Sequence, residues 1–297
     1  MNAVTCSHLT KTYREKKAVN DLSVSIEENK ITGIIGRNGA GKTTFLQIVA
    51  GFQKPTSGEV MVFGENPFNS LNASANTIFI NDTMNLPNSL TVYEILESAA
   101  SFYPNWDKEL AERLFEYFSF QRSQRHDRLS KGMRSTFNMI LGLSSRCQLT
   151  IFDEPTTGMD AAVRSDFYRA LLKDYLAHPR TLLLSSHHLN EIEELIEDVF
   201  LIKDGTGHLH LSVSDLKEYG VGIQGPDEQV EEWIEGIDVF HKRDIPVNKS
   251  YAVIKREDLR SGYEKAGLTV SPVSATDMSM YLTEKRTGGI DDVFNRS

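Results

Sequence analysis

The chain has 297 residues, of which 40% are hydrophobic and 25% charged, and its formal net charge is −9. These values are ordinary for a globular protein with one large or two modest domains, and they exclude the disordered class. The acidic balance argues against nucleic acid or bare anionic lipid as the main partner. No apolar run reaches the roughly 18 residues of a membrane helix, and the N-terminus lacks a signal-peptide layout, so we expect a cytoplasmic protein.

Residues 36 to 43 read Gly-Arg-Asn-Gly-Ala-Gly-Lys-Thr, a complete G-x-x-x-x-G-K-[ST] phosphate-binding loop. The loop follows an apolar run at 31–35, which predicts a strand, and precedes a segment at 44–49 that suits a helix. Its glycines let backbone N–H groups converge on phosphates at the positive end of that helix. Lys42 adds a charge for the β- and γ-phosphates, and the Thr43 hydroxyl adds a ligand for Mg²⁺. The motif therefore predicts a nucleoside triphosphate and Mg²⁺ at Gly36, Asn38, Gly39, Gly41, Lys42, Thr43 and Thr44.

From residue 1 to about residue 207, predicted strands alternate with helices, which is typical of an α/β fold with a largely parallel sheet. In such a sheet, ligands bind at the carboxyl ends of the strands. Between about 82 and 142 a helical pattern replaces the alternation, and apolar residues in 108–119 recur at i, i+4, i+7 and i+8. We interpret this stretch as a helical subdomain inserted in the sheet domain. We expect its aromatic residues to pack its core: Phe102, Tyr103, Trp106, Phe115, Phe118 and Phe120.

A mostly apolar run at 149–152 ends in two adjacent carboxylates, Asp153 and Glu154. Downstream of a phosphate loop, such a strand is typical of a Walker-B element. Asp153 would help to hold Mg²⁺, and Glu154 is placed to polarise the attacking water. The pattern therefore predicts hydrolysis of the bound nucleotide.

The composition changes after about residue 210, and we expect a separate accessory or regulatory α/β domain at 211–297. The pattern predicts a strand at 251–255, then a helix containing Leu259, Tyr263 and Ala266. A strand at 268–273 and a helix near 277–284 follow. The region contains no recognisable catalytic constellation.

The segment Leu129-Ser130-Lys131-Gly132-Met133 lies between the phosphate loop and the strand at 149–152. The Ser130 hydroxyl and the Gly132 backbone stand at the start of a predicted helix, where they can bind a γ-phosphate. The segment resembles the signature of the ATP-binding cassette (ABC) family, which normally reads Leu-Ser-Gly-Gly-Gln. It departs from that pattern at Lys131 and Met133.

The resemblance implies roles for three further segments. Tyr13 falls where the family stacks an aromatic ring on the adenine of ATP. His187 ends the predicted strand 182–186, as the family's switch histidine does, and we expect the neighbouring His188 to be a surface residue. The turn at 157–160 is similar to the one through which the two halves of a cassette dimer communicate. The family's glutamine loop reads Asn81-Asp82 here, and we favour Asn81 for the glutamine position, with Asp82 as the alternative.

These motifs cover roughly residues 3–210, which we take as an ABC ATPase domain at 1–210. The resemblance implies a dimer in which each ATP lies between the phosphate loop of one chain and Ser130 and Gly132 of the other. The second cassette is either another copy or a related chain. The stretches at 130–133, 103–106 and 280–283 further resemble bacterial ATPase subunits that serve separate ABC-2-type permeases. That narrower resemblance implies an integral-membrane permease as partner, export, and a peripheral position on the inner face of the membrane. The alternative is a soluble or signalling ABC ATPase that regulates a partner by ATP-driven dimerisation.

Overall fold

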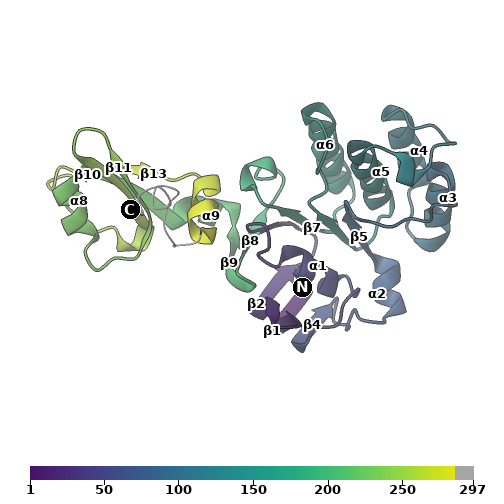
Figure 1. The fold of residues 1–297 in the computed structure, drawn as a ribbon, viewed down its shortest axis with the longest axis horizontal. Helices are drawn as coiled ribbons and strands as arrows, with labels where there is room; N and C mark the ends of the chain where they lie inside the picture. The colour runs from purple at the N-terminus through teal and green to yellow at the C-terminus, as the bar shows by residue number, and fades with distance from the viewer. Residues whose placement is uncertain (285–297) are drawn as a thin grey trace. The chain divides into compact units, whose positions relative to one another are not determined.

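The computed structural model describes residues 1–284. It divides between Ser212 and Val213 into two compact units, which are described separately here (Figure 1). The last part of the accessory domain expected at 211–297, residues 285–297, lies outside the described residues. Within residues 1–284, no helix is both long enough and apolar enough to span a bilayer.

A six-stranded sheet forms the centre of the first unit, in the order β5-β6-β7-β3-β8-β9. The first five strands in this order run parallel, and β9 pairs antiparallel with β8. Strands β3, β6 and β7 are buried at every residue, as expected of parallel strands covered on both faces. The bounds are β3 (Ile31–Ile35), β5 (Thr77–Asn81), β6 (Leu149–Asp153), β7 (Thr181–Ser186), β8 (Asp198–Lys203) and β9 (Thr206–Ser212).

A second, antiparallel sheet of order β2-β1-β4 lies in the same unit. Its strands are β1 (Asn2–Tyr13), β2 (Lys16–Glu27) and β4 (Ser57–Val62). Their apolar residues share one core with α1 (Lys42–Val49), in which the Phe45 ring packs edge-on against Phe200 at 5.7 Å. The helix that follows the phosphate loop is therefore fixed between the two sheets.

The helical subdomain consists of α3 (Val92–Phe102), α4 (Lys108–Tyr117) and the outer part of α5 (Lys131–Ser144) (Figure 1). Each of these helices begins at a side-chain cap, because Thr91, Asp107 and Ser130 accept a hydrogen bond from a backbone N–H three residues ahead. Phe115 and Phe120 are buried as predicted, whereas the expectation for Phe102 is wrong: it ends α3 and is 57% exposed. The remaining helices of this unit are α2 (Leu71–Asn76), η1 (His126–Arg128), α6 (Ala161–Ala177) and η2 (Leu189–Glu191).

The second unit is built on an antiparallel sheet of order β11-β12-β10-β13. Helix α8 covers one face of this sheet, and its Val230 is buried together with Val221, Ile223 and Ile254 of the strands. The helix predicted around Tyr263 is wrong: the segment forms successive turns, because Gly262 and Gly267 bracket only four residues. The bounds are α7 (Val213–Tyr219), β10 (Gly220–Pro226), α8 (Asp227–Ile234), β11 (Val239–Ile245), β12 (Lys249–Lys255), η3 (Arg256–Asp258), β13 (Thr269–Pro272) and α9 (Ala275–Thr283).

Candidate nucleotide-binding site

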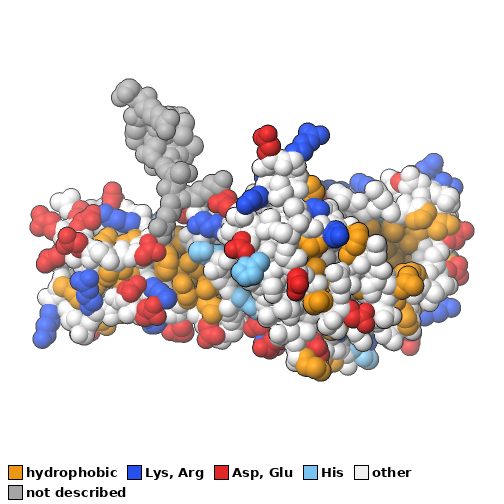
Figure 2. All heavy atoms as spheres, turned by 90° about the horizontal axis from the view of Figure 1, so that it is seen from below, with side chains coloured by type: hydrophobic (Ala, Val, Ile, Leu, Met, Phe, Trp, Pro, Cys, Tyr) orange, Lys and Arg blue, Asp and Glu red, His pale blue; other side chains and the backbone are white. Residues whose placement is uncertain are grey.

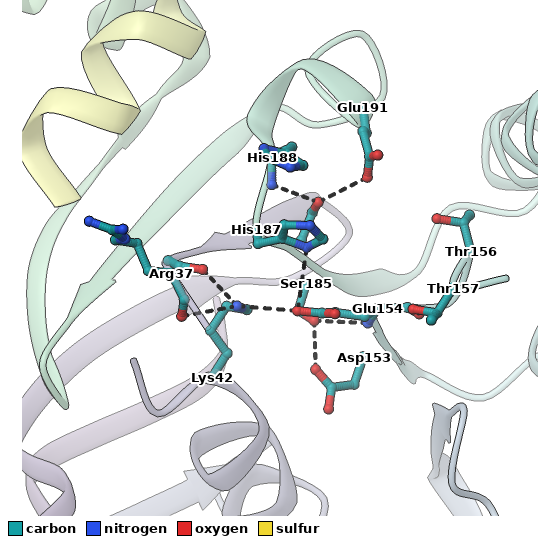
Figure 3. Close-up of polar contacts among 12 residues, drawn as sticks. Arg37, Lys42, Asp153, Glu154, Thr156, Thr157, Ser185, His187, His188 and Glu191 are labelled. Carbon is teal, nitrogen blue, oxygen red and sulfur yellow. Dashed lines mark hydrogen bonds and ion pairs between the residues drawn. The ribbon is translucent and has the colours of Figure 1, made fainter. Parts of the chain in front are cut away.

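The carboxyl ends of β3, β6 and β7 lie next to one another in the sheet. The phosphate loop follows β3, Glu154 follows β6, and His187 follows β7. Side chains that are far apart in sequence therefore converge at one edge, and Figure 3 shows Lys42, Asp153, Glu154 and His187 grouped there.

The phosphate loop is held in a conformation that only glycine permits at two points. A Cβ atom on Gly36 would lie 2.4 Å from the carbonyl oxygen of Ile202. Gly41 has φ +107°, and a Cβ atom there would lie 2.3 Å from the Ala18 carbonyl oxygen. Helix α1 begins directly after Gly41 and has no acidic residue in its first turn. Its positive end is therefore available to an anion.

Lys42 points into the loop and is almost completely buried, with 6% of its side chain exposed. Its Nζ atom donates to the carbonyl oxygen of Gly36 at 2.6 Å and lies 3.5 Å from that of Arg37. It also lies 3.3 Å from Oε1 of Glu154. The ammonium group is thus positioned between the loop and the end of β6 (Figure 3).

Asp153 ends β6 and is joined to β7 through Ser185, whose Oγ donates to Oδ1 of Asp153 at 2.6 Å. The same Oγ accepts a hydrogen bond from the Glu154 N–H at 2.9 Å. Burial raises the pKa of the Asp153 carboxyl above its ordinary value of 3.8, and hydrogen bonds from Ser185 and Thr43 oppose that shift. Sequence reasoning missed Ser185, although the signal was present: a polar residue near the end of an otherwise apolar strand.

The Thr43 hydroxyl and the Asp153 carboxylate form an oxygen donor pair, which suits a hard divalent cation. Within residues 1–284, no cluster of three or more His, Cys, Asp or Glu side chains could hold a metal by itself. Mg²⁺ commonly takes one or two protein oxygens and completes its shell with phosphate and water. The residues present fit Mg²⁺ bound together with a nucleotide.

Glu154 has φ +48°, a left-handed conformation that is uncommon for a residue with a side chain. The Thr157 hydroxyl donates to the Glu154 carbonyl oxygen at 2.8 Å and supports this turn. The Nδ1 atom of His187 lies 3.7 Å from Oε1 of Glu154. Lys42 and His187 therefore approach the same carboxylate oxygen from two sides.

A further network supports the segment around His187. The Ser186 hydroxyl accepts from the His188 N–H at 3.0 Å and donates to Glu191 at 3.2 Å. Glu191 in turn pairs with Arg164 of α6 at 2.9 Å. Both histidine side chains are exposed, and sequence reasoning missed the roles of Glu191 and Arg164.

The structure does not bring Ser130 and Gly132 to the phosphate loop of their own chain. Ser130 caps α5, and its Oγ accepts from the Met133 N–H at 3.3 Å. A Cβ atom on Gly132 would lie 2.5 Å from the Gly158 carbonyl oxygen, so this turn packs on the loop after β6. Within residues 1–284, no hydrogen bond or ion pair joins Ser130 or Gly132 to residues 36–43.

Asn81 and Tyr13 occupy two other places. Asn81 ends β5 beside Asp153, and its carbonyl oxygen accepts from the Asn138 side chain at 3.1 Å. Asp82 pairs instead with Lys131 at 3.3 Å. Tyr13 ends β1, is 42% exposed and donates its hydroxyl hydrogen to Gln53. The roles expected for Asn81 and Tyr13 stay predictions.

Comparisons with known proteins identify the family. The model of the ABC transporter family matches residues 19–157. The chain is 30% identical over 217 residues to the uncharacterised ABC transporter ATP-binding protein YcbN of Bacillus subtilis. This match covers 70% of this chain and 69% of YcbN. The chain belongs to the ABC transporter ATP-binding proteins. The predicted family is confirmed, and this ABC ATPase binds ATP and hydrolyses it.

This ABC ATPase is also 32% identical over 200 residues to the bacitracin transport ATP-binding protein BcrA of Bacillus licheniformis, over 66% of this chain and 65% of BcrA. Among solved structures, the dimeric ATP-binding cassette MJ0796 bound to ADP and phosphate matches with a TM-score of 0.63 and 21% identity. That match covers 70% of this chain and 98% of MJ0796. The structural likeness confirms the predicted fold, an ABC nucleotide-binding domain.

Proposed function

We propose that this ABC ATPase is the subunit that powers a separate membrane permease, and that the permease is an exporter. The observation that carries the proposal is the division of the nucleotide site. Lys42, Asp153, Glu154 and His187 converge at one edge of the sheet, whereas Gly132, in the turn that Ser130 caps, packs on the loop at 157–159. One chain holds both halves of a site without joining them, which supports a site completed by a second chain.

In the proposed reaction, the phosphate loop and Lys42 bind the phosphates of ATP, and Tyr13 contacts the adenine ring. Thr43 and Asp153 would hold Mg²⁺, which would neutralise charge on the phosphate oxygens when bound. Glu154 accepts a proton from the attacking water, and the Thr157 hydroxyl supports the turn that carries its carboxylate. His187 contacts the γ-phosphate and Asn81 orients the water. Ser130 and Gly132 of the second cassette, a copy or a related chain, bind the γ-phosphate from the opposite side.

The helical subdomain supplies a surface for the permease. A cavity of about 190 Å³ between α3 and α4 is mostly apolar, with Leu96, Ala100 and Trp106 in its lining and Glu97, Lys108 and Glu112 among the residues around it. An apolar recess with charged residues beside it suits a short helix of a partner protein. On the face shown in Figure 2, Lys and Arg side chains are interspersed with Asp and Glu, which favours a protein partner over nucleic acid.

Export follows from the ABC-2-type resemblance, and similarity to BcrA, named for bacitracin transport, supports a transport role. We propose that the transported molecule is recognised by the permease. The second unit, from Val213 onward, is proposed as an accessory or regulatory domain. The ATPase is proposed to lie on the cytoplasmic face of the membrane through its permease.

The test is purification of the tagged chain from its native cells in mild detergent, followed by identification of stoichiometric partners. We expect a polytopic membrane protein. The variant Ala100→Glu, which places a charge in the α3–α4 cavity, should lose this partner and keep ATP binding. The matched variant Leu176→Glu, on the exposed side of α6, should retain it. A purely soluble partner would contradict the proposal and favour the regulatory alternative.

A further inference from the structure

We propose that Asp82 and Lys131 form a positioning contact that sets the turn at 130–132 toward the nucleotide of a second chain. The inference rests on the proposed function, because it requires a site shared between chains. Oδ2 of Asp82 lies 3.3 Å from Nζ of Lys131. Within residues 1–284, no ion pair or hydrogen bond joins either residue to Lys42, Glu154 or His187, so their action would pass through the turn that they hold.

The two residues stand at the two connections of the helical subdomain. Asp82 follows β5 directly, where the chain leaves the central sheet for α3 and α4. Lys131 is the first residue of α5, which carries the chain back toward the sheet. The segment that leads into α3 and the segment that leads back to α5 are also joined by a backbone hydrogen bond. In it, the Val92 N–H donates to the Gln124 carbonyl oxygen at 2.9 Å. The Asp82–Lys131 pair therefore joins the two segments that connect the subdomain to the central sheet.

The Lys131 side chain also packs on the loop that follows Glu154. A Cβ atom on Gly158 would lie 3.0 to 3.3 Å from the Cγ, Cδ and Cβ atoms of Lys131. One turn later in α5, the Ser135 hydroxyl donates to the Thr157 carbonyl oxygen at 2.8 Å. The first turn of α5 is thus joined to both Asp82 and the Walker-B loop, and Lys131 takes part in both contacts.

A buried contact further along α5 provides a second anchor. The Asn138 side chain donates to the Asn81 carbonyl oxygen at 3.1 Å, and its Oδ1 lies 2.8 Å from Nε2 of His126. Asn138 lies seven residues after Lys131 on the same helix, or about 10 Å along its axis. Two anchors at this spacing, both on residues that end or follow β5, define the direction of the helix. The end nearer to Ser130 is held by Lys131 together with the hydrogen bond from Ser135 to Thr157.

Electrostatics favours a carboxylate at position 82 in this arrangement. A cation at the start of a helix faces the positive end of the helix dipole, and α5 has no acidic residue in its first turn. Asp82 supplies the missing negative charge from a different segment. Both side chains are partly exposed, 36% for Asp82 and 55% for Lys131, so we expect the pair to change a rate severalfold and not to decide folding.

Charge reversal tests the inference. The variants are Asp82→Lys, Lys131→Glu and the double variant, each purified as the full chain. We expect each single variant to lower kcat by about fivefold, the scale of one partly exposed ion pair. The KM for ATP and nucleotide binding by the monomer should stay within about twofold, because the phosphate loop is intact. The double variant, with the pair restored in reverse, should return kcat to within about twofold of the unaltered chain.

The matched control is the ion pair of Arg113 and Glu109 on α4, 3.4 Å apart, and reversing either charge there should leave all kinetic constants unchanged. A double variant no better than Lys131→Glu alone would overturn the inference, since it would show that a cation is needed at 131 itself. ATP-driven dimerisation of Glu154→Gln is measured alongside. If that variant stays monomeric, a site shared between copies of this chain fails and the inference falls with it. Dimerisation of Glu154→Gln without recovery of kcat in the double variant would overturn this inference and leave the proposed function standing.

Discussion

The Nζ atom of Lys42 lies 3.3 Å from Oε1 of Glu154, and this pair joins the phosphate loop to the end of β6. The lysine that would bind the β- and γ-phosphates is thus paired with the carboxylate that would polarise water. A γ-phosphate entering the loop competes with Glu154 for the Lys42 ammonium. Nucleotide binding would therefore release Glu154, the proposed general base, from its ion pair with Lys42.

The variant Glu154→Gln is expected to bind ATP with at least the affinity of the unaltered chain and to hydrolyse it at least about 10²-fold more slowly. Glutamine cannot accept the proton of the attacking water, and it no longer competes as an anion for Lys42. Single-turnover hydrolysis and equilibrium binding separate the two effects. Glu59→Gln, an exposed residue of β4, is the control and should leave both unchanged. Near-normal turnover by Glu154→Gln would remove Glu154 from its proposed role.

The variant Ser130→Ala is expected to impair hydrolysis while leaving ATP binding by the monomer nearly intact, because its hydroxyl would act on the nucleotide of the second chain. The change also removes the cap of α5, which costs about 1 kcal/mol of stability. Thr91→Ala removes the cap of α3 and is the matched control for that loss. Comparable losses of hydrolysis in the two variants would show that Ser130 acts only as a cap.

The variant Asp153→Asn is expected to unfold at a higher temperature than the unaltered chain at pH 7 and to lose Mg²⁺-dependent hydrolysis by about 10²-fold or more. Burial raises the pKa of Asp153, so the folded chain holds this proton more tightly than the unfolded chain. The carboxylate therefore destabilises the fold as pH rises above 3.8 through the folded-state pKa, and the amide avoids that cost. Calorimetry without nucleotide measures the effect, and a lower melting temperature for the variant would contradict it.

The chain is expected to lose stability as pH falls below 6.5, partly through His126. Burial lowers the pKa of His126 from its ordinary value of 6.5, so the unfolded chain takes up this proton more readily than the folded chain. The stabilising contribution is complete above 6.5 and decreases as pH falls toward the folded-state pKa. Urea unfolding at pH 8 and pH 5 should show a smaller difference for His126→Gln than for the unaltered chain. His8→Gln changes an exposed histidine and is the control. If the free energy of unfolding fell equally between pH 8 and pH 5 in both variants, that result would count against this account.

Much of the central sheet and its nucleotide loop could be predicted because the information is local. The residues at 31–49 specify strand, loop and helix in sequence, and the observed β3 and α1 fall within that range. The strand before Asp153 was also clear, since a buried parallel strand reads as a nearly continuous apolar run, interrupted here at Thr150.

Other features depend on contacts between distant residues and left weak signals in the sequence. The pairing of β1 with β2 contains several register shifts, which interrupt the alternation that marks an antiparallel strand. Ser185 and Glu191 are ordinary polar residues until the fold places them beside Asp153 and Ser186. The Asp82–Lys131 contact spans 49 residues and could not be predicted from either position alone.

The central claim is that each site is shared between two chains, and mixing two inactive variants tests it most directly. Lys42→Ala lacks a phosphate-loop lysine, and Ser130→Arg blocks the opposite half-site. In a mixed dimer one site combines both defects, while the other joins an intact Lys42 to an intact Ser130. We predict that the mixture hydrolyses ATP at a rate that neither variant reaches alone. Activity no greater than the sum of the separate variants, under conditions where the unaltered chain is active, would contradict a site shared between copies of this chain.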